Sequence, residues 1–243
     1  MNRILVYLAI GCVGLAAQTP GKAISGIPVP DVNERTLQET YHIAPTKEGL
    51  LVALQHPSPS VRNFAATKLA ESGDKSATRP ILAALAAETV ESSKIILATS
   101  ASKLGAAEGF DALKSMCSDR SSSPEQRMNA AHSMVLLLGR QECLSDILEV
   151  LWAPAADHPR ADAMALGVLS GFKQIPPIRL DEIRNLSTVY VKSQEWEVRL
   201  AASQLITVLG GPWAISQLQA ALDVERDENV RRFIASNLGS LQK

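Results

Sequence analysis

Histidines, cysteines and arginines are the residues of this chain that could carry chemistry, and their spacing decides what they can do. The four histidines are His42, His56, His132 and His158, and none lies four residues from another histidine or from a cysteine. Two metal ligands on one helical face need such a spacing, so we expect no sequence-local metal site. The chain also lacks a G-x-S-x-G elbow, a Walker loop and a Rossmann fingerprint. The sequence therefore predicts no catalytic residues, cofactor or metal, and no enzyme.

The first seventeen residues have the pattern of a secretory signal. The basic start Met1-Asn2-Arg3 precedes an uncharged run over residues 4–17, and the chain then becomes polar. A membrane-spanning helix needs about 20 apolar residues, so this run is too short to span. Gly14 and Ala16 supply the small residues of a cleavage site, and residues 1–17 are interpreted as a signal peptide. We expect export to the periplasm or the exterior, without membrane insertion after cleavage.

The part of the chain after the signal peptide consists largely of repeated helix pairs, which must position any binding site. An alanine is followed three residues later by a large apolar residue six times, at intervals of 35, 30, 32, 39 and 33 residues. Such a period predicts stacked supersecondary units and not a closed globule. Each unit reads as two helices separated by a polar turn, so we predict an all-α superhelical solenoid of about six two-helix repeats over residues 47–243. The anchor alanines are Ala66, Ala101, Ala131, Ala163, Ala202 and Ala235.

Residues 18–46 are interpreted as an extended linker and a partial N-terminal cap. Prolines and glycines between residues 20 and 30 disfavour regular structure. Asn33 is a candidate N-cap for a short helix to about Tyr41, and Pro45 prevents its continuation.

Composition argues against nucleic acid as a partner. The formal net charge is −1, and the residues show no basic stripe that could neutralise phosphates. Aromatic residues make up only 4% of the chain, so alanine and leucine supply most of the 46% hydrophobic content. This composition suits thin layers of closely packed helices.

Three units carry the dipeptide Val-Arg near the start of their second helix, as Val61-Arg62, Val198-Arg199 and Val230-Arg231. Together with a leucine-bearing first helix, a turn rich in Pro, Ser or Asp and a following Ala-Ala-x-x-Leu, this pattern resembles the HEAT repeat, in the short form that phycobilisome lyases also contain. The resemblance covers about residues 47–243, although the second and fourth units lack Val-Arg. It implies a right-handed superhelix, with first helices on the convex side and second helices on the concave side, and a binding function, usually for protein.

The resemblance also implies a role for Arg62, Arg127 and Arg231, which each lie four residues before an anchor alanine. In HEAT-like proteins such arginines bond to turn carbonyls or to acids of neighbouring units and form an internal ladder. Ligand binding by these arginines is the alternative.

The cysteines leave alternatives open. Leu8-Ala9-Ile10-Gly11-Cys12 resembles a bacterial lipobox, so a lipid anchor at Cys12 competes with simple cleavage. Removal of the signal leaves Cys117 and Cys143, an even number that favours a disulfide in an exported protein. The repeat register argues otherwise, because it offsets the two residues by about 9 Å along neighbouring helices that are themselves about 10 Å apart. A disulfide needs Cα atoms within about 7 Å, so we expect two free thiols.

The concave face is the expected partner-binding surface. Positions three before, one after and five after each anchor point away from the core at 100° per residue. In the third and fourth units they carry apolar residues and methionine, and arginines follow towards the C-terminus, both of which suit protein interfaces. Tight curvature is the alternative, because it would bury these residues between second helices. The predicted partner-binding residues are Met128, His132, Leu136, Arg160, Met164, Val168, Arg199 and Arg232.

These features predict a monomeric, exported, non-enzymatic scaffold that binds a protein partner on its concave face. One alternative is a structural module of an envelope assembly with no ligand of its own. Another is an enzyme related to bilin lyases. The export signal, and the lack of a sequence signature for an aromatic, acid-bearing pocket, argue against the enzyme.

Overall fold

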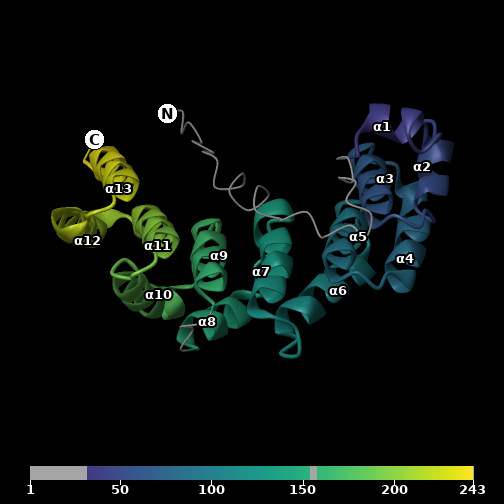
Figure 1. Cartoon of the computed structure of the whole chain (residues 1–243). Helices are drawn as coiled ribbons and strands as arrows, with labels where there is room; N and C mark the ends of the chain where they lie inside the picture. Colours follow the sequence, from purple (N-terminus) through teal and green to yellow (C-terminus); the bar gives the residue numbers. More distant parts are fainter. Residues whose placement is uncertain (1–31, 154–157, 243) are drawn as a thin grey trace.

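All regular structure in the computed structural model, which describes residues 32–153 and 158–242, is helical (Figure 1). The predicted signal peptide, Cys12 and residues 18–31 of the predicted linker and cap lie outside these residues. A 3₁₀ turn, η1 (Lys75–Ala77), and a π-helical turn, η2 (Ser133–Leu137), accompany the α-helices in the described ranges. The α-helices are α1 (Glu34–Glu39), α2 (Lys47–Ala53), α3 (Pro59–Glu71), α4 (Thr78–Ala87), α5 (Glu91–Lys103), α6 (Ala107–Ser118), α7 (Pro124–His132), α8 (Leu144–Trp152), α9 (Pro159–Ser170), α10 (Pro177–Tyr190), α11 (Trp196–Leu209), α12 (Gly211–Val224) and α13 (Glu228–Leu241).

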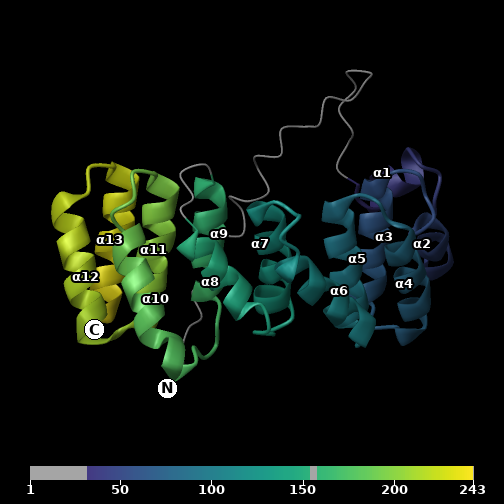
Figure 2. The same ribbon diagram turned by 90° about the horizontal axis from the view of Figure 1, so that it is seen from below.

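The helices form two rows that follow an arch (Figure 1). The odd-numbered helices α3 to α13 lie on its inner side, and the even-numbered helices α2 to α12 lie on its outer side. Neighbouring inner helices pack on one another, α3 on α5, α7 on α9, α9 on α11 and α11 on α13. Seen from below, the helix pairs follow one another from α1 and α2 at one end to α12 and α13 at the other (Figure 2). The predicted all-α, solenoid-type fold is confirmed.

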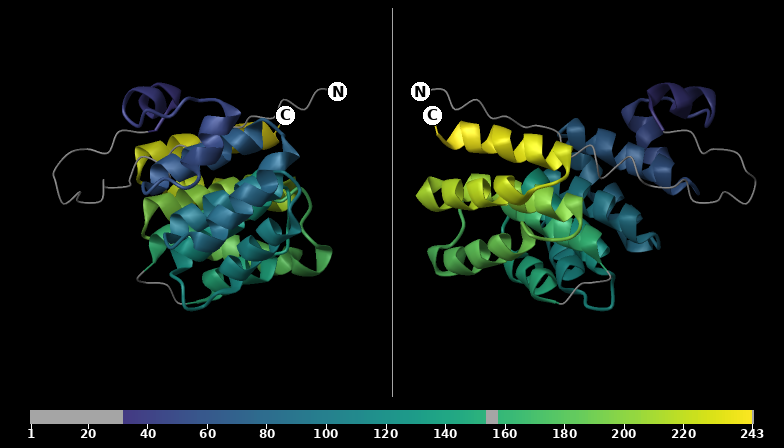
Figure 3. Two further views of the ribbon diagram at one scale, coloured as in Figure 1. Left: turned by 90° about the vertical axis from the view of Figure 1, so that its right-hand side faces the viewer. Right: turned by 60° about the vertical axis from the view of Figure 1, so that its left-hand side comes forward.

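The apolar core runs along the array instead of gathering at one centre. Views along the arch show the helices in successive layers (Figure 3). Buried apolar residues form one cluster from Leu37 to Ala106 and a second from Ile95 to Leu238, and the two overlap in α5. Each layer therefore buries its apolar face against its neighbours, as a stack of repeats must.

Proline and cap residues decide where several helices begin. Pro59, Pro124, Pro159 and Pro177 are the first residues of α3, α7, α9 and α10. Proline fits this position because the first helical N–H has no partner within the helix. The second helix of the first unit accordingly begins at Pro59 and not at Val61. Asn33 caps α1 as predicted and accepts a hydrogen bond from the N–H of Thr36, but the helix ends at Glu39.

Buried positions on the inner helices repeat with one spacing, and α9 follows it in a shifted register. In both α3 and α9, four residues are at most 2% exposed, and successive members of the set lie four, one and three residues apart. They are Val61, Ala65, Ala66 and Leu69 in α3, and Ala161, Ala165, Leu166 and Leu169 in α9. The predicted anchor Ala163 is only half-buried. The anchor predicted for the fourth unit therefore lies three residues before the position that corresponds to Ala66.

Cys117 and Cys143 form a disulfide with their Cα atoms 6.0 Å apart, so the prediction of two free thiols was wrong. That prediction assumed that neighbouring outer helices begin at the same height. Instead, Arg140 lies over Phe110, near the start of α6, with its guanidinium carbon 4.9 Å from the ring centroid. Three residues later the chain reaches Cys117, near the end of α6. The connection thus runs along α6, and α8 begins where α6 ends.

Candidate functional site

Arg62 ties two successive units together. Its Nη1 donates to the carbonyl oxygens of His56 and Pro57, at 2.7 Å each, in the turn before its own helix. Its Nε and Nη2 donate to Glu88 Oε2 at 2.9 and 2.6 Å. Glu88 ends α4, and its other carboxylate oxygen accepts from the N–H groups of Thr89 and Val90 at the start of α5. We call this arrangement an arginine–glutamate clamp.

Arg199 makes the second arginine–glutamate clamp. Its Nη1 donates to the carbonyl oxygens of Ser193 and Gln194, and its Nε and Nη2 donate to Glu225. Arg199 was predicted to bind a partner, and the structure corrects this, because its guanidinium already makes four hydrogen bonds inside the protein. The error arose because Arg199 lies three residues before its anchor Ala202, whereas the other ladder arginines lie four residues before theirs.

Two further arginines complete the ladder. Arg127 is 6% exposed, and its Nε donates to the carbonyl oxygen of Cys117 at 2.8 Å, while Nη1 reaches Glu149 at 3.5 Å. Arg231 Nη1 donates to the carbonyl oxygens of Leu222 and Glu225 at 3.3 Å. The predicted ladder role of Arg62, Arg127 and Arg231 is therefore confirmed.

The clamps keep two buried glutamates ionised. Burial by itself would raise the pKa of Glu88, but hydrogen bonds from the N–H of Val90 and from Arg62 outweigh it and hold the pKa below its ordinary value. The pKa of Glu225 is lowered in the same way, with burial opposed by Arg199 and by the N–H of Asp227. Hydrogen bonds to the charged form favour that form. Each clamp is thus a charged, fully paired contact.

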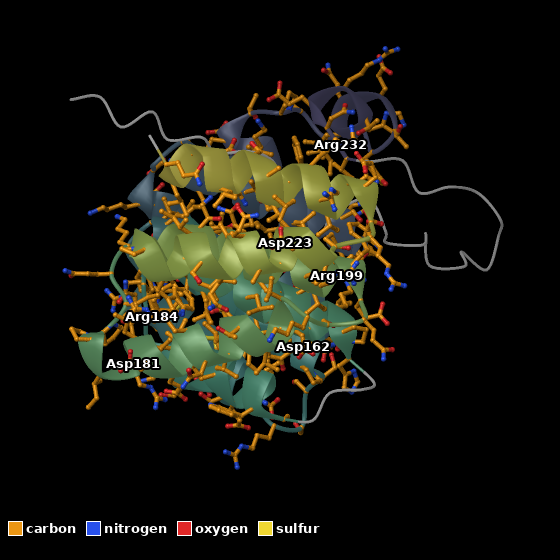
Figure 4. All side chains as sticks on the ribbon, turned by 90° about the vertical axis from the view of Figure 1, so that its left-hand side faces the viewer. Asp162, Asp181, Arg184, Arg199, Asp223 and Arg232 are labelled. Carbon is orange, nitrogen blue, oxygen red and sulfur yellow. A yellow bond between two sulfur atoms is a disulfide. The ribbon has the colours of Figure 1, made fainter. Side chains whose placement is uncertain are left out.

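In α9 an acid occupies the position that the ladder arginines occupy in other inner helices. The spacing of buried residues in α9 places Asp162 where Arg62 stands in α3, one residue after the first buried position. Asp162 is 6% exposed, and its Oδ1 has no hydrogen-bond partner among the described residues. Figure 4 shows Asp162 and Arg199 towards the same edge of neighbouring inner helices α9 and α11. A buried acid thus replaces the expected arginine.

Asp162 lines a cavity of about 360 Å³ between the C-terminal ends of α8 and α10 and the first turn of α9. Trp152 and Val189 stand at its open side with 60% and 67% of their surface exposed. The lining residues are Leu151, Trp152, Ala153, Asp162, Asn185, Leu186, Val189 and Tyr190. The wall is therefore mainly apolar and aromatic, with a single carboxylate.

Hydrogen bonds fix the aromatic residues of this cavity. Tyr190 donates its hydroxyl to the carbonyl oxygen of Leu151 at 2.7 Å, which joins α10 to α8. Trp152 Nε1 donates to Glu182 Oε1 at 2.7 Å. These bonds position both side chains before any ligand arrives.

Burial also shifts the ionisation of the cavity residues. Burial raises the pKa of Asp162 to about 6, with His158 lowering and Glu125 raising it by smaller amounts. Burial together with the charge of Asp162 raises the pKa of Tyr190 to about 12. At neutral pH the cavity therefore contains a mostly ionised carboxylate that is poorly solvated.

The predicted concave-face residues do not share one environment. Met128 and Val168 are 0% and 3% exposed, so they belong to the core and cannot contact a partner. The reason is that α7 packs against α5 and α9, and α9 packs against α7 and α11. The alternative of curvature that buries the stripe is thus correct for these two positions. His132 and Met164 are half-buried, and burial lowers the pKa of His132.

Three predicted residues remain accessible on the inner row. Leu136 is 44% exposed in η2, the π-helical turn that follows α7. Arg160 and Arg232 are exposed in the first turns of α9 and α13. The accessible part of the predicted stripe is therefore smaller than expected and is divided among three helical segments.

The structure also bears on metal binding and membrane insertion within its described ranges. No group of three or more His, Cys, Asp or Glu side chains there is arranged to hold a metal ion. None of the helices described is both long and apolar enough to cross a bilayer.

Sequence reasoning missed the cavity at Asp162. The absence of Val-Arg from the fourth unit was the available signal, but the three-residue register error hid the acid at the ladder position. The expected absence of an aromatic, acid-bearing pocket is consequently corrected, because Trp152, Asp162 and Tyr190 line one. Trp152 and Tyr190 come from different units, so no local motif could reveal their proximity.

Comparisons with known proteins assign the chain to no family. No protein-family model matches the chain, and no curated protein matches it. Among solved structures, the chain is similar to a crystal structure of an engineered protein from a structural genomics consortium, at 17% identity and a TM-score of 0.47. The similarity covers 81% of this chain and 96% of that one.

Proposed function

We propose that the protein is an exported, non-enzymatic scaffold of the HEAT-like type, which binds another protein on the inner row of its arch. The observation that carries the proposal is the repeated clamp. Arg62 with Glu88, and Arg199 with Glu225, hold successive layers in a fixed relation near both ends of the array. A curved array with fixed layers offers an extended, preorganised surface, which is how repeat proteins bind partners.

The disulfide supports the exported location. Structural disulfides persist in oxidising compartments and are rare in the cytosol. The bond between Cys117 and Cys143 therefore agrees with the signal-like pattern of residues 1–17, from which export is inferred.

Charge reversal on the inner row tests the binding role. The purified mature chain is first used to capture a partner from the exported fraction of its host, and the partner is then purified for direct titration. Arg160→Glu with Arg232→Glu changes two exposed inner residues, whereas Arg35→Glu with Arg79→Glu makes the same charge change on α1 and α4. We expect at least a tenfold rise in Kd for the inner pair, and an unchanged Kd for the control.

Both variants should melt at the wild-type temperature, because all four residues are exposed. Equal affinity of the two variants for the partner would refute binding on the inner row. Failure to enrich any exported protein over unfolded chain on the same resin would refute the scaffold role itself.

A further inference from the structure

The cavity at Asp162 combines three independent features. An acid occupies the position of a ladder arginine, its Oδ1 is buried without a hydrogen-bond partner among the described residues, and the cavity opens to solvent beside two aromatic side chains. We propose that this cavity binds the guanidinium group of an arginine side chain from a partner polypeptide. The incoming arginine would supply the cation that the chain itself provides in other units.

The charge in the cavity favours a cation. A carboxylate taken out of water without a partner is costly, so its retention at Asp162 indicates a cation that pairs with it in the functional state. The C-terminal ends of α8 and α10 also meet at the cavity, and neither helix has a basic residue in its last turn. Helix C-termini carry partial negative charge and favour cations. The first turn of α9 offsets part of this field, but it donates no hydrogen bond to Asp162 Oδ1.

The shape of the cavity suits an arginine side chain. Arginine presents a planar head that pairs with a carboxylate through two hydrogen bonds and stacks on aromatic rings. Trp152 and Tyr190 provide such rings beside Asp162. A volume of about 360 Å³ lies at the lower end of the range for ligand pockets, which suits one long side chain better than a large cofactor. Asp162 is the one carboxylate in the lining, which falls well short of the roughly six to eight oxygen ligands that Ca²⁺ takes.

The surroundings of the cavity suit a polypeptide. Trp152 and Val189 extend an apolar rim around its opening, and Glu182 lies within hydrogen-bond distance of Trp152. Residues that flank an arginine in a polypeptide could contact this rim, whereas a free guanidinium compound could not. The cavity opens between the outer helices α8 and α10, and Asp162 reaches it from the first turn of the inner helix α9. Its occupancy is followed at Trp152 and Asp162, whereas binding on the inner row is tested at Arg160 and Arg232, so the two proposals can fail separately.

Titration with defined probes tests the proposal. The full mature chain is labelled with ¹⁵N, and the indole N–H resonance of Trp152 is followed during addition of acetyl-Gly-Ala-Arg-Ala-Gly-amide. The matched peptide contains citrulline, which keeps the shape of arginine but lacks its charge. Nα-acetyl-arginine amide tests a free guanidinium compound. We expect the arginine peptide to shift the resonance with a Kd at least tenfold lower than either of the other probes.

Substitutions identify the acid that binds. Asp162→Asn should raise the Kd for the arginine peptide at least tenfold, and Asp181→Asn, an exposed acid on α10, should leave it unchanged. Figure 4 shows the labels of Asp181 and Asp162 well apart in the view, with Asp181 towards the start of α10. The melting temperature of Asp162→Asn at pH 7 serves as the folding control, and it should not fall below the wild-type value.

The pH dependence of peptide affinity distinguishes a binding role of Asp162 from a purely structural one. The charged groups that influence Asp162 are His158 at the start of α9 and Glu125 on α7, with Tyr190 facing it from α10. In a His158→Gln background, the affinity should fall about tenfold per pH unit below pH 6, and Asp162→Asn should abolish this slope. Equal binding of the citrulline peptide, full binding by Asp162→Asn, or no shift at millimolar peptide would overturn the proposal. Equal binding of Nα-acetyl-arginine amide would overturn the assignment to a polypeptide.

Discussion

Arg199 and Glu225 repeat the clamp of Arg62 and Glu88, with four arginine hydrogen bonds in each, in a different part of the array. Arg62 donates twice to Glu88 Oε2, whereas Arg199 donates once to each carboxylate oxygen of Glu225. In both clamps the glutamate follows the arginine by 26 residues, and the carbonyl acceptors precede it by five and six residues. The geometry therefore belongs to the repeat and not to one location. A buried ionic contact that recurs in this way fixes the register between layers, which apolar packing alone specifies weakly.

Loss of one clamp arginine should destabilise the protein strongly. Arg62→Ala leaves the carboxylate of Glu88 buried, with its side chain 0% exposed and its main cation removed. Removing one partner of a buried pair costs about 3 kcal/mol in the free energy of unfolding. Urea denaturation followed by circular dichroism measures this change. Arg35→Ala is the matched control, since the Arg35–Glu39 pair has side chains 81% and 61% exposed, and it should leave the midpoint unchanged.

The clamps also predict a loss of stability in acid. The pKa of Glu88 and of Glu225 is lower in the folded protein than in the unfolded chain. Their contribution is therefore present above about pH 4.5 and is lost as pH falls through the folded-state pKa. Denaturation curves between pH 3 and 6 should show this loss, and Glu88→Gln with Glu225→Gln should flatten it. An unchanged acid slope in that double variant would contradict the assigned role of the clamps.

The disulfide should be detectable and stabilising. After unfolding without reductant, an alkylating reagent should leave Cys117 and Cys143 unmodified, and mass spectrometry would show this directly. The bond closes a loop of 26 residues, so reduction should cost about 3 kcal/mol on the loop-entropy model. Cys117→Ser with Cys143→Ser should lower the midpoint similarly and abolish the effect of reductant. Two alkylated cysteines in untreated protein would contradict the bond.

Asp162 should give a pH dependence of opposite sign to the clamps. Its pKa rises from 3.8 to about 6 on folding, so the folded chain holds a proton that the unfolded chain releases. Stability contributed by this group is therefore full below about pH 4 and falls as pH rises through 6. The cost at pH 7 is about 2 kcal/mol, after allowance for partial solvation. The stability of Asp162→Asn relative to wild type should increase between pH 4 and 7, and a constant difference would contradict the shift.

The N-terminus carries a prediction from sequence alone. If residues 1–17 act as a signal peptide, protein isolated from its host should begin near Ala17 or Gln18 and carry no lipid. Intact mass spectrometry of the exported protein checks both points. A species that begins at an acylated Cys12 would establish the lipobox alternative and would tether the array to a membrane.

Periodic features could be predicted from sequence, and features that depend on exceptions to the period could not. Arg62, Arg127 and Arg231 were assigned correctly because each recurs at a fixed distance from an alanine. Cys117 and Cys143 were misjudged because the connection after η2 runs along α6, and such a path leaves no periodic trace. Asp162 was missed because the anchor chosen for α9 lies three residues too early. With that anchor, Asp162 did not align with the ladder arginines.

The inner row separates into core and surface positions that matched substitutions can distinguish. Met128 is 0% exposed in α7, while Met164 is half-buried in α9, although both were predicted for the same stripe. Met128→Ala should lower the free energy of unfolding by about 3 kcal/mol, because it removes buried methylene groups and leaves a cavity. Met164→Ala should cost less than half as much, since its site is already open to water. Urea denaturation with a common slope measures both. Equal losses would show that Met164 is also part of the core, which would leave Leu136, Arg160 and Arg232 as the accessible remainder of the predicted binding face.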